Sequence, residues 1–406
     1  MEYVDKEDKM MKKIKKEIKH LKHIIEKIFI KLFNGILIIL PLQKEKILFL
    51  SDVRQTLGGN LENLYNFIPD NRYKKVISTK ADRRIKRILK EKIKLVYNLS
   101  TAKYILLEDY VTIISYIKAR KGQEIVQLWH GAGAFKKFGN SRLKKYGGDI
   151  TRVHSGYKKY TKAITSSEDI RPCYAEAFNI SIEKVKATGF PRTDMFFDEK
   201  IIEQKKSELY KKYPFLNHKK VILFAPTFRG TKVREANYDF NKLDLEKIYN
   251  EFKDEYVFIF KWHPAVYNNI VFGEVEGYDF SKYENFYYDL SKERDINDLL
   301  LITDLLITDY SSVIFDYVFM KKPVIYFAYD LEDYKGDRGL YFPFEEYVYG
   351  KVAIKNDELI QAIKEEDMQE EKREKFKKKF LEACDGHSTE KTYRWIFEDT
   401  KKRNNK

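Results

Sequence analysis

Short apolar runs, each a few residues long and separated by segments with helical spacing, dominate the sequence after residue 43. A first series comprises residues 46–51, 76–78, 94–97, 104–107, 125–128 and 163–166, and a second comprises residues 221–224, 256–261, 305–308, 323–327 and 352–353. Strands that alternate with helices form parallel βαβ units. The sequence therefore predicts an α/β protein with two Rossmann-like, doubly wound domains facing a cleft. Ligands of such sheets bind beyond the carboxyl ends of the strands.

A charged helical segment, residues 199–213, is followed by Pro214 and a polar tract that ends at Lys220. We expect the boundary between the two domains here. The expected parts are an N-terminal helix over residues 1–43, an N-terminal domain over 44–213 and a C-terminal domain over 214–406. The last forty residues are charged and helical in pattern, with a break at Asp385-Gly386.

The first 43 residues are basic and patterned. Residues 1–31 contain ten lysines against six acidic residues, and apolar residues recur in steps of three and four at Met11, Ile14, Ile18, Leu21, Ile25, Ile28 and Leu32. Such spacing predicts an amphipathic helix. The apolar stretch 28–42 would reach only about 22 Å, short of the roughly 30 Å hydrocarbon core of a bilayer. We expect an uncleaved helix in the headgroup region of an anionic leaflet. A coiled-coil partner helix and a helix packed on its own domain are the alternatives.

The net charge of +15 favours anionic partners such as phosphates, anionic lipid or nucleic acid, and cannot choose among them. A nucleic-acid binding protein is the least favoured class, because the excess charge lies at the termini and no zinc, RRM-like or basic-helix signature is present. The two cysteines, Cys173 and Cys384, match no metal spacing or disulfide framework. This pattern favours a reducing compartment and argues against zinc.

Two histidines follow predicted strands. The run 125–128 leads into Trp129-His130-Gly131-Ala132-Gly133, with Lys136 close behind, and the run 256–261 leads into Trp262-His263-Pro264. A histidine at such a turn can transfer a proton near neutral pH, whereas a packed turn histidine is the plain alternative. Lys136 occupies the third glycine position of a G-x-G-x-x-G pattern, so a dinucleotide dehydrogenase is poorly supported.

Phosphate-binding chemistry follows two strands of the second series. Arg229 comes after the run 221–224, and its bidentate fork would suit a diphosphate, although a surface arginine is the alternative. The run 305–308 leads into Asp309-Tyr310-Ser311-Ser312 and then a helical segment, 313–320. Because Asp and Ser are N-cap residues, the strand is expected to turn directly into a helix whose N-terminus binds phosphate. An ordinary capped helix is the alternative. Asp316 falls on the same face as Ser312 and could reach a ribose or cap a loop.

Seven ordered motifs together resemble the CDP-glycerol glycerophosphotransferases of teichoic acid synthesis. They are WHGAGAFKKFG (129–139), TSSE (165–168), TGFPRTD (188–194), FAPTFRG (224–230), KWHP (261–264), TDYSSVIFDYVFMKKPVIYF (308–327) and DRGLYF (337–342). The likeness covers residues 47–387. It implies a GT-B type fold and transfer of glycerol phosphate from CDP-glycerol to a hydroxyl of a lipid-linked acceptor of the undecaprenyl-diphosphate disaccharide type, releasing CMP.

The resemblance also implies roles for single residues. His130 would be the base for the acceptor hydroxyl, and His263 would stabilise the transferring phosphate. The implied CDP-glycerol site comprises Arg229, Thr308, Asp309, Ser311, Ser312 and Asp316, and the implied acceptor or cleft residues are Gly131, Lys136, Ser167, Glu168, Arg192 and Asp194. The segment Asp385-Gly386-His387-Ser388 resembles the family's D-G-x-A/S ending, in which His387 takes a variable slot and receives no role.

The resemblance further implies a peripheral enzyme on the cytoplasmic face of a bacterial cell membrane. No DxD-like acidic pair precedes the helical segment after residue 312, so we expect no cofactor and metal-independent chemistry. The larger polymerases of the family carry long extra regions, which favours a priming enzyme that adds one unit. A ribitol or other polyol or sugar-phosphate donor of teichoic acid or capsule synthesis is the alternative, and a homo-oligomer is left open.

Overall fold

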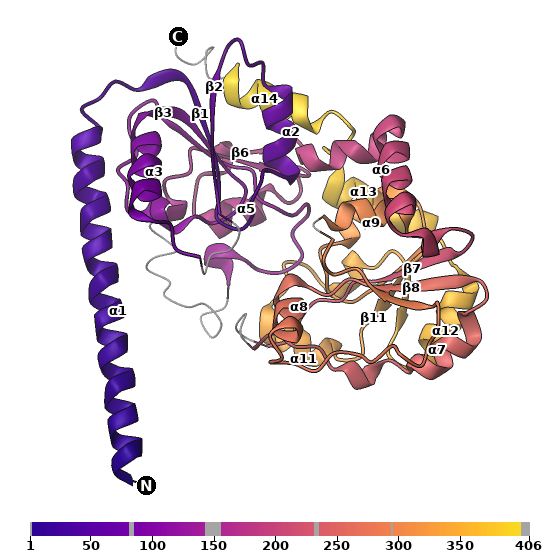
Figure 1. The fold of residues 1–406 in the computed structure, drawn as a ribbon. Coiled ribbons are helices and arrows are strands. Elements are labelled where there is room, and N and C mark those ends of the chain that lie inside the picture. The colour runs from indigo at the N-terminus through magenta and orange to yellow at the C-terminus, as the bar shows by residue number, and fades with distance from the viewer. Residues whose placement is uncertain (1, 81–84, 143–155, 231–234, 294, 399–406) are drawn as a thin grey trace. The chain divides into compact units, whose positions relative to one another are not determined.

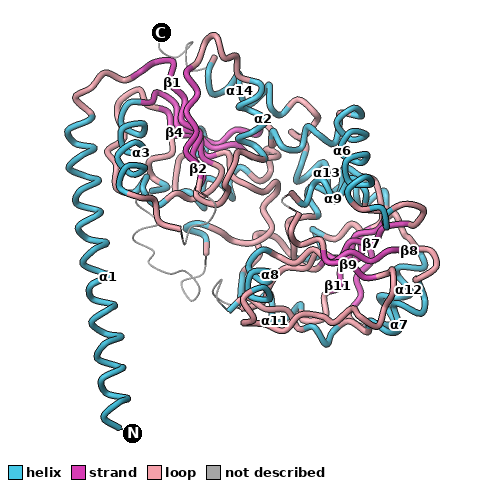
Figure 2. The backbone as a smooth tube through the Cα atoms, viewed as in Figure 1, coloured by secondary structure: helices cyan, strands magenta, loops and turns pink. Residues whose placement is uncertain are grey.

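The computed structural model describes residues 2–80, 85–142, 156–230, 235–293 and 295–398 (Figure 1). The strands gather into two six-stranded sheets, drawn in magenta in Figure 2 and accompanied by helices. The α/β class with two doubly wound sheets is thereby confirmed. A cleft between two facing domains stays a prediction.

The first sheet has the strand order β2-β1-β3-β4-β5-β6, and neighbouring strands from β2 to β5 run parallel. Its strands are β1 (Gln43–Ser51), β2 (Lys74–Thr79), β3 (Ala102–Leu107), β4 (Glu124–Gln127), β5 (Lys162–Thr165) and β6 (Val185–Ala187), and the helices of this region are α2 (Gly59–Phe67), α3 (Leu89–Thr101) and α5 (Arg171–Phe178). The chain turns to opposite sides after β1 and β3. These neighbours therefore form the topological switch point, where α/β sheets bind ligands.

The second sheet has the order β12-β11-β10-β7-β8-β9, with every neighbouring pair parallel. Its strands are β7 (Lys220–Phe224), β8 (Tyr256–Phe260), β9 (Tyr287–Asp289), β10 (Leu305–Thr308), β11 (Val324–Phe327) and β12 (Lys351–Ala353). The helices are α6 (Glu199–Lys212), α7 (Leu245–Phe252), α8 (Pro264–Val271), α9 (Ile296–Ile302), α10 (Ile314–Tyr317), α11 (Leu331–Arg338), α12 (Asn356–Glu365), α13 (Glu370–Leu381) and α14 (Ser388–Phe397). Here the switch point lies between β7 and β10.

The central strands of the second sheet are buried along almost their whole length. All five residues of β8 are buried, as are the last four residues of β7. Continuous apolar strands of this kind belong to parallel sheets covered on both faces. Each fully buried large apolar side chain stabilises the fold by about 1.5 to 3 kcal/mol. The loops that leave these strands are therefore anchored on a firmly packed core.

One predicted strand is wrong. Residues 94–97 lie inside α3, in which Leu95, Val96 and Leu99 are buried while Ile93 and Tyr97 are exposed. That burial has the helical period, and a run of four residues is too short to separate a strand from a buried helix face by pattern alone. The short strands β6 and β9 were not predicted.

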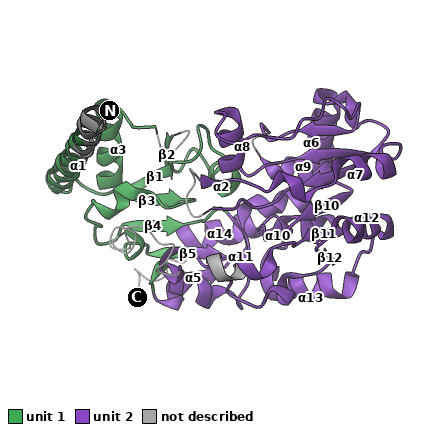
Figure 3. Ribbon diagram, turned by 90° about the horizontal axis from the view of Figure 1, so that it is seen from below, with its two compact units in different colours: residues 1–130, 149–163, 178–180 green, residues 131–148, 164–177, 181–406 purple. Residues whose placement is uncertain are grey.

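The chain divides into two compact units, coloured separately in Figure 3. The first contains residues 1–130, 149–163 and 178–180, and the second contains residues 131–148, 164–177 and 181–406. The domain limits expected from the sequence stay a prediction.

Helix α1 (Glu2–Leu37) is anchored on the first unit near its C-terminal end. The buried Asn34 side chain donates to Ser100 Oγ (2.8 Å) and accepts from the Lys118 backbone N–H (2.8 Å), and Glu26 pairs with Lys92. The apolar stripe is exposed from Ile14 through Leu32. Among the helices of the described residues, none has both the length and the apolar character that crossing a bilayer requires.

Candidate active site

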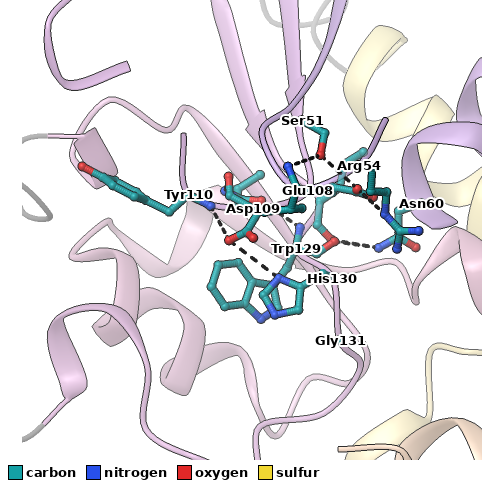
Figure 4. Close-up of polar contacts among 12 residues, drawn as sticks. Ser51, Arg54, Asn60, Glu108, Asp109, Tyr110, Trp129, His130 and Gly131 are labelled. Atoms are coloured by element: carbon teal, nitrogen blue, oxygen red, sulfur yellow. Dashed lines mark hydrogen bonds and ion pairs between the residues drawn. The ribbon is translucent and has the colours of Figure 1, made fainter. Parts of the chain in front are cut away.

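The switch point of the first sheet gathers polar side chains from three loops (Figure 4). Ser51 ends β1 and Arg54 follows it, Glu108 and Asp109 follow β3, and His130 follows β4. The imidazole of His130 is half exposed, at 49% of its side-chain surface, and its Nδ1 lies 3.9 Å from Asp109 Oδ1. The structure thus places His130 at a strand end, beside a carboxylate that sequence reasoning missed.

The turn that carries His130 is strained and tightly held. Trp129 has φ +56°, a left-handed conformation that a bulky residue rarely adopts. The buried Asn60 side chain donates to the carbonyls of Leu128 (3.2 Å) and Trp129 (2.9 Å), and Gln127 Oε1 accepts from the Trp129 N–H (2.9 Å). Such strain costs about 1 to 3 kcal/mol and persists where surrounding contacts determine the backbone. These buried amides therefore fix the backbone of the turn that carries the histidine.

Glu108 belongs to the same cluster and is almost fully buried. Its Oε1 lies 2.6 Å from Arg54 Nε and accepts a hydrogen bond from Ser51 Oγ (3.3 Å). Burial raises the pKa of Glu108, and the Arg54 guanidinium opposes that rise. The signal that sequence reasoning overlooked was the acidic pair Glu108-Asp109 immediately after a predicted strand.

At the switch point of the second sheet, Arg229 connects the loop after β7 to two other strand ends. Its Nε and Nη2 donate to the two carboxylate oxygens of Asp330 (2.6 and 2.8 Å), which follows β11. Its Nη1 donates to Asp309 Oδ2 (2.9 Å), which follows β10, and to the Thr227 carbonyl (3.0 Å). The guanidinium thus forms a buried network with two carboxylates. Its predicted contact with a diphosphate stays a prediction.

Asp309 is not a helix cap. Its Oδ1 accepts hydrogen bonds from the backbone N–H groups of Thr227 (2.8 Å) and Tyr310 (2.6 Å). Burial raises the pKa of Asp309, and the charge of Arg229 opposes the shift. The short helix α10 begins only at Ile314, after Val313, whose apolar side chain cannot accept a hydrogen bond. Helical backbone over residues 314–320 does follow the end of β10, as expected, but Asp309 does not cap it, because Arg229 and the Thr227 N–H take its carboxylate.

Other predicted residues join this region. Thr308 Oγ1 donates to the Ala225 carbonyl (2.7 Å), and Lys136 Nζ donates to Thr227 Oγ1 (2.7 Å). Ser311 Oγ accepts from the Val313 N–H at 3.4 Å. A Cβ added at Gly131 would lie 4.0 Å from Ser312 Oγ, so these two predicted residues are neighbours.

Two motifs of the sequence analysis meet through their backbones. Lys136 forms an antiparallel bridge with Leu340, and the Lys137 N–H donates to the Gly339 carbonyl (3.0 Å). The segment that follows His130 is therefore tied to the DRGLYF segment. The side chains of Asp337 and Arg338 lie outside the described residues.

The remaining cleft predictions fall on contacts that hold the second unit together. Arg192 forms an ion pair with the buried Asp316, and Asp194 accepts from the backbone N–H groups of Ser388 (2.9 Å) and Thr389 (2.8 Å) at the start of α14. Burial raises the pKa of Asp316 to about 6, against the effect of Arg192. Ligand-binding roles for Arg192, Asp194 and Asp316 stay predictions.

Ser167 and Glu168 have local partners as well. Ser167 Oγ donates to the Lys379 carbonyl in α13 (2.6 Å), and Glu168 pairs with Arg171 at 2.5 Å. Ser167 therefore ties the loop after β5 to a C-terminal helix.

His263 sits at the N-terminus of α8, and its side chain is its cap. Its Nδ1 accepts a hydrogen bond from the Ala265 N–H (3.2 Å), and its ring lies 4.7 Å from that of Phe228. A backbone N–H can only donate, so Nδ1 is unprotonated and the neutral ring carries its proton on Nε2. The Nε2–H group of His263 can therefore donate a hydrogen bond to an anion.

Within the described ranges, no three His, Cys, Asp or Glu side chains gather as a metal site would require. Metal-independent chemistry stays a prediction.

The comparisons with known proteins cover nearly the whole chain. The family described as CDP-Glycerol:Poly(glycerophosphate) glycerophosphotransferase matches residues 32–398. The chain belongs to this family. The identification made from the seven motifs is confirmed.

Relatives of this glycerophosphotransferase-family chain include a teichoic acid poly(ribitol-phosphate) polymerase of Bacillus spizizenii W23, 43% identical over 357 residues. That alignment covers 87% of this chain and 56% of the polymerase, so the chain spans little more than half the length of that relative. A teichoic acid ribitol-phosphate primase of the same strain is 31% identical, with 92% of this chain and 96% of the primase aligned. Proteins named for glycerol-phosphate transfer also match.

Among solved structures, the wall teichoic acid polymerase TagF superposes with a TM-score of 0.75 at 24% identity. The match covers 96% of this chain and 98% of the TagF chain. This likeness shows that the chain has the fold of TagF.

Proposed function

We propose that the protein is a polyol-phosphate transferase of teichoic acid synthesis, acting from a CDP-polyol donor on a lipid-linked glycan acceptor. The observation that carries this proposal is the family match over residues 32–398, which includes both strand-end histidines. In the proposed reaction, the acceptor hydroxyl oxygen bonds to the phosphorus of the polyol phosphate. The bond from that phosphorus to the bridging oxygen breaks, and CMP leaves.

His130 takes the proton of the attacking hydroxyl in this reaction. Its half-exposed ring on a fixed turn supports that role, because general bases must be held at a defined position. His263 donates from Nε2 to an oxygen of the transferring phosphate, which the bond between Nδ1 and the Ala265 N–H supports. Phosphoryl transfer depends mainly on positioning and charge neutralisation, and one well-placed donor contributes about 2.7 to 4 kcal/mol.

The donor region is proposed at the second switch point. Lys136 brings positive charge there, Arg229 is bonded to Asp309 and Asp330, and Thr308, Asp309, Ser311 and Ser312 lie at the end of β10 and in the loop after it. The same proposal includes a GT-B type arrangement of the two domains, in which the acceptor enters from the N-terminal half. It also includes peripheral association of the enzyme with the membrane.

Two polyols are candidates for the donor. CDP-ribitol is the first, because the relative with 43% identity is named a ribitol-phosphate polymerase. CDP-glycerol, which the sequence motifs placed first, is the second, because the family description names it and a TagF variant was solved after soaking with CDPG. We also propose a priming role, in which one unit is added, because the ribitol-phosphate primase aligns with this chain over nearly its whole length.

Incubation with a lipid-linked disaccharide and both CDP-polyols in competition tests the reaction. CMP release identifies the donor, and the mass of the product counts the units added. Rejection of both donors would overturn the transferase proposal, whereas a long product would overturn only the priming role.

We also propose that α1 attaches the enzyme to an anionic membrane surface. Leu21 and Ile25 are each 57% exposed on the stripe, although the helix is anchored through Asn34. Each basic residue near such a surface contributes about 1 kcal/mol of binding. Deleting residues 1–43 would remove Asn34 as well, so the sharper variant is Ile18→Gln/Leu21→Gln/Ile25→Gln.

This triple variant should lose sedimentation with liposomes that contain anionic lipid, and keep activity on a soluble acceptor analogue. Val352→Gln/Ile354→Gln is the matched control, because these apolar side chains are also exposed but lie at strand β12. Unchanged binding of the triple variant would contradict the attachment.

A further inference from the structure

The two consecutive carboxylates after β3 have different partners. Glu108 is buried against Arg54 and Ser51, whereas Asp109 lies beside the imidazole of His130, as Figure 4 shows. The side chain of Asp109 is only 13% exposed. Glu108 is paired with Arg54, and of these two carboxylates Asp109 is the one that has an oxygen within ion-pair distance of the His130 ring.

The position of Asp109 is fixed by contacts of its own. Its Oδ1 accepts from the Tyr110 N–H (2.6 Å), and its carbonyl accepts from Gln127 Nε2 (3.2 Å). The other end of the Gln127 amide accepts from the Trp129 N–H (2.9 Å). One fully buried amide thus joins the turn of Asp109 to the turn of His130, so the carboxylate and the imidazole are held as a pair.

We propose that Asp109 is a positioning residue that holds His130 in the tautomer protonated at Nδ1. In this tautomer Nε2 is unprotonated, so its lone pair can take the proton of the acceptor hydroxyl. This inference rests on the proposed function, because it assigns the role through which His130 becomes a base. The separation of 3.9 Å is an ion-pair distance, and such contacts between catalytic groups shorten to hydrogen bonds when substrate binds.

Other titratable groups lie at the same switch point as Asp109. Among the described residues of the first unit they include the Glu108–Arg54 pair and the phenol of Tyr160, which accepts from Gln127 Nε2 (3.0 Å). The phenol is buried, and burial raises the pKa of Tyr160 far above neutrality. Loss of the Asp109 charge is therefore expected to lower the pKa of His130.

Asp109→Asn is the decisive variant, since it keeps the shape and removes the charge. Nitrogen NMR of the ligand-free protein, assigned by the signal that His130→Ala removes, should show a smaller share of the Nδ1–H tautomer, because a neutral amide oxygen accepts a hydrogen bond more weakly than a carboxylate. The titration of His130 should move to lower pH by at least about 0.7 units, from the interaction of unit charges 4 Å apart in water. We expect kcat to fall at least about tenfold with KM for the CDP-polyol nearly unchanged, and the acid limb of the pH profile to follow the titration.

Two further variants sharpen the test. Asp109→Glu restores the charge and should recover the tautomer in part. Glu124→Gln removes a carboxylate at the other end of β4, where it accepts from Thr161 Oγ1 (2.6 Å), and should leave the His130 titration unchanged. An Asp109→Asn protein with an unaltered tautomer and titration would overturn the inference. If His130→Ala keeps its turnover, the catalytic role of His130 fails instead, while the NMR result still decides the pairing.

Discussion

The network of Arg229 with Asp309 and Asp330 offers a quantitative test of the second switch point. Arg229→Met removes a cation of which only 15% is exposed and leaves the Asp309 carboxylate, 1% exposed, without its counter-charge. Breaking a buried pair in this way costs about 3 to 5 kcal/mol. We expect a loss of unfolding free energy in that range at pH 7.5.

The same variant should depend on pH in a defined direction. Burial already raises the pKa of Asp309, and removal of Arg229 removes the charge that opposes this shift. A native carboxyl whose pKa is raised begins to bind a proton at a pH where the unfolded chain, with a pKa near 3.9, still does not. The variant therefore gains stability as the pH falls through the raised native pKa toward the unfolded value. The gain approaches about 1.4 kcal/mol per pH unit where only the native state is protonated.

Urea unfolding followed by tryptophan fluorescence measures this effect. A Trp129→Phe background leaves Trp262 and Trp395, both in the second unit, as reporters. Arg229→Met/Asp309→Asn is the control and should lose most of the pH dependence. If Arg229→Met lowers the unfolding free energy by less than about 1 kcal/mol, or if this destabilisation grows as the pH falls, the reasoning is refuted. A parallel titration with CDP asks whether Arg229 also contributes to donor binding.

Three further predictions follow from single contacts. His130→Ala and His263→Ala should each abolish turnover in the CMP-release assay with little effect on CDP affinity, and near wild-type turnover would remove the role of that residue. Gly133→Ala should destabilise the second unit by about 3 kcal/mol or more in urea, because its Cβ would lie 2.3 Å from the Phe315 ring at a φ of +69°. Asp194→Ala should cost about 0.5 to 2 kcal/mol by the same assay, since it removes the cap of α14, and an unchanged midpoint would contradict that role.

The two sheets differ in strand order, and this difference decides which loops can form a site. In the first sheet the switch point is β1/β3, so Arg54 and Glu108 meet. In the second it is β7/β10, so Arg229 and Asp309 meet. The sequence shows that all four residues follow strands, but it contains no signal for which strands are neighbours.

The sequence by itself determined the class of fold, the positions of most strands and the family. Strands of a parallel sheet are buried on both faces, so they appear in the sequence as continuous apolar runs separated by helical segments. The local pattern was therefore sufficient to predict the fold class and most strands. The position of His130 and His263 at strand ends was likewise readable, because each directly follows an apolar run.

Only the tertiary structure decided which partners the polar residues take. Asp309 looked like a helix cap and instead accepts from Arg229 and Thr227, while Asn60 and Gln127 gave no local signal of their place around the His130 turn. Capping is a local preference worth about 1 kcal/mol, whereas separating a buried guanidinium from its carboxylate costs about 3 to 5 kcal/mol. Contacts between distant strand ends therefore override the local pattern, and they depend on a strand order that no short stretch of sequence encodes.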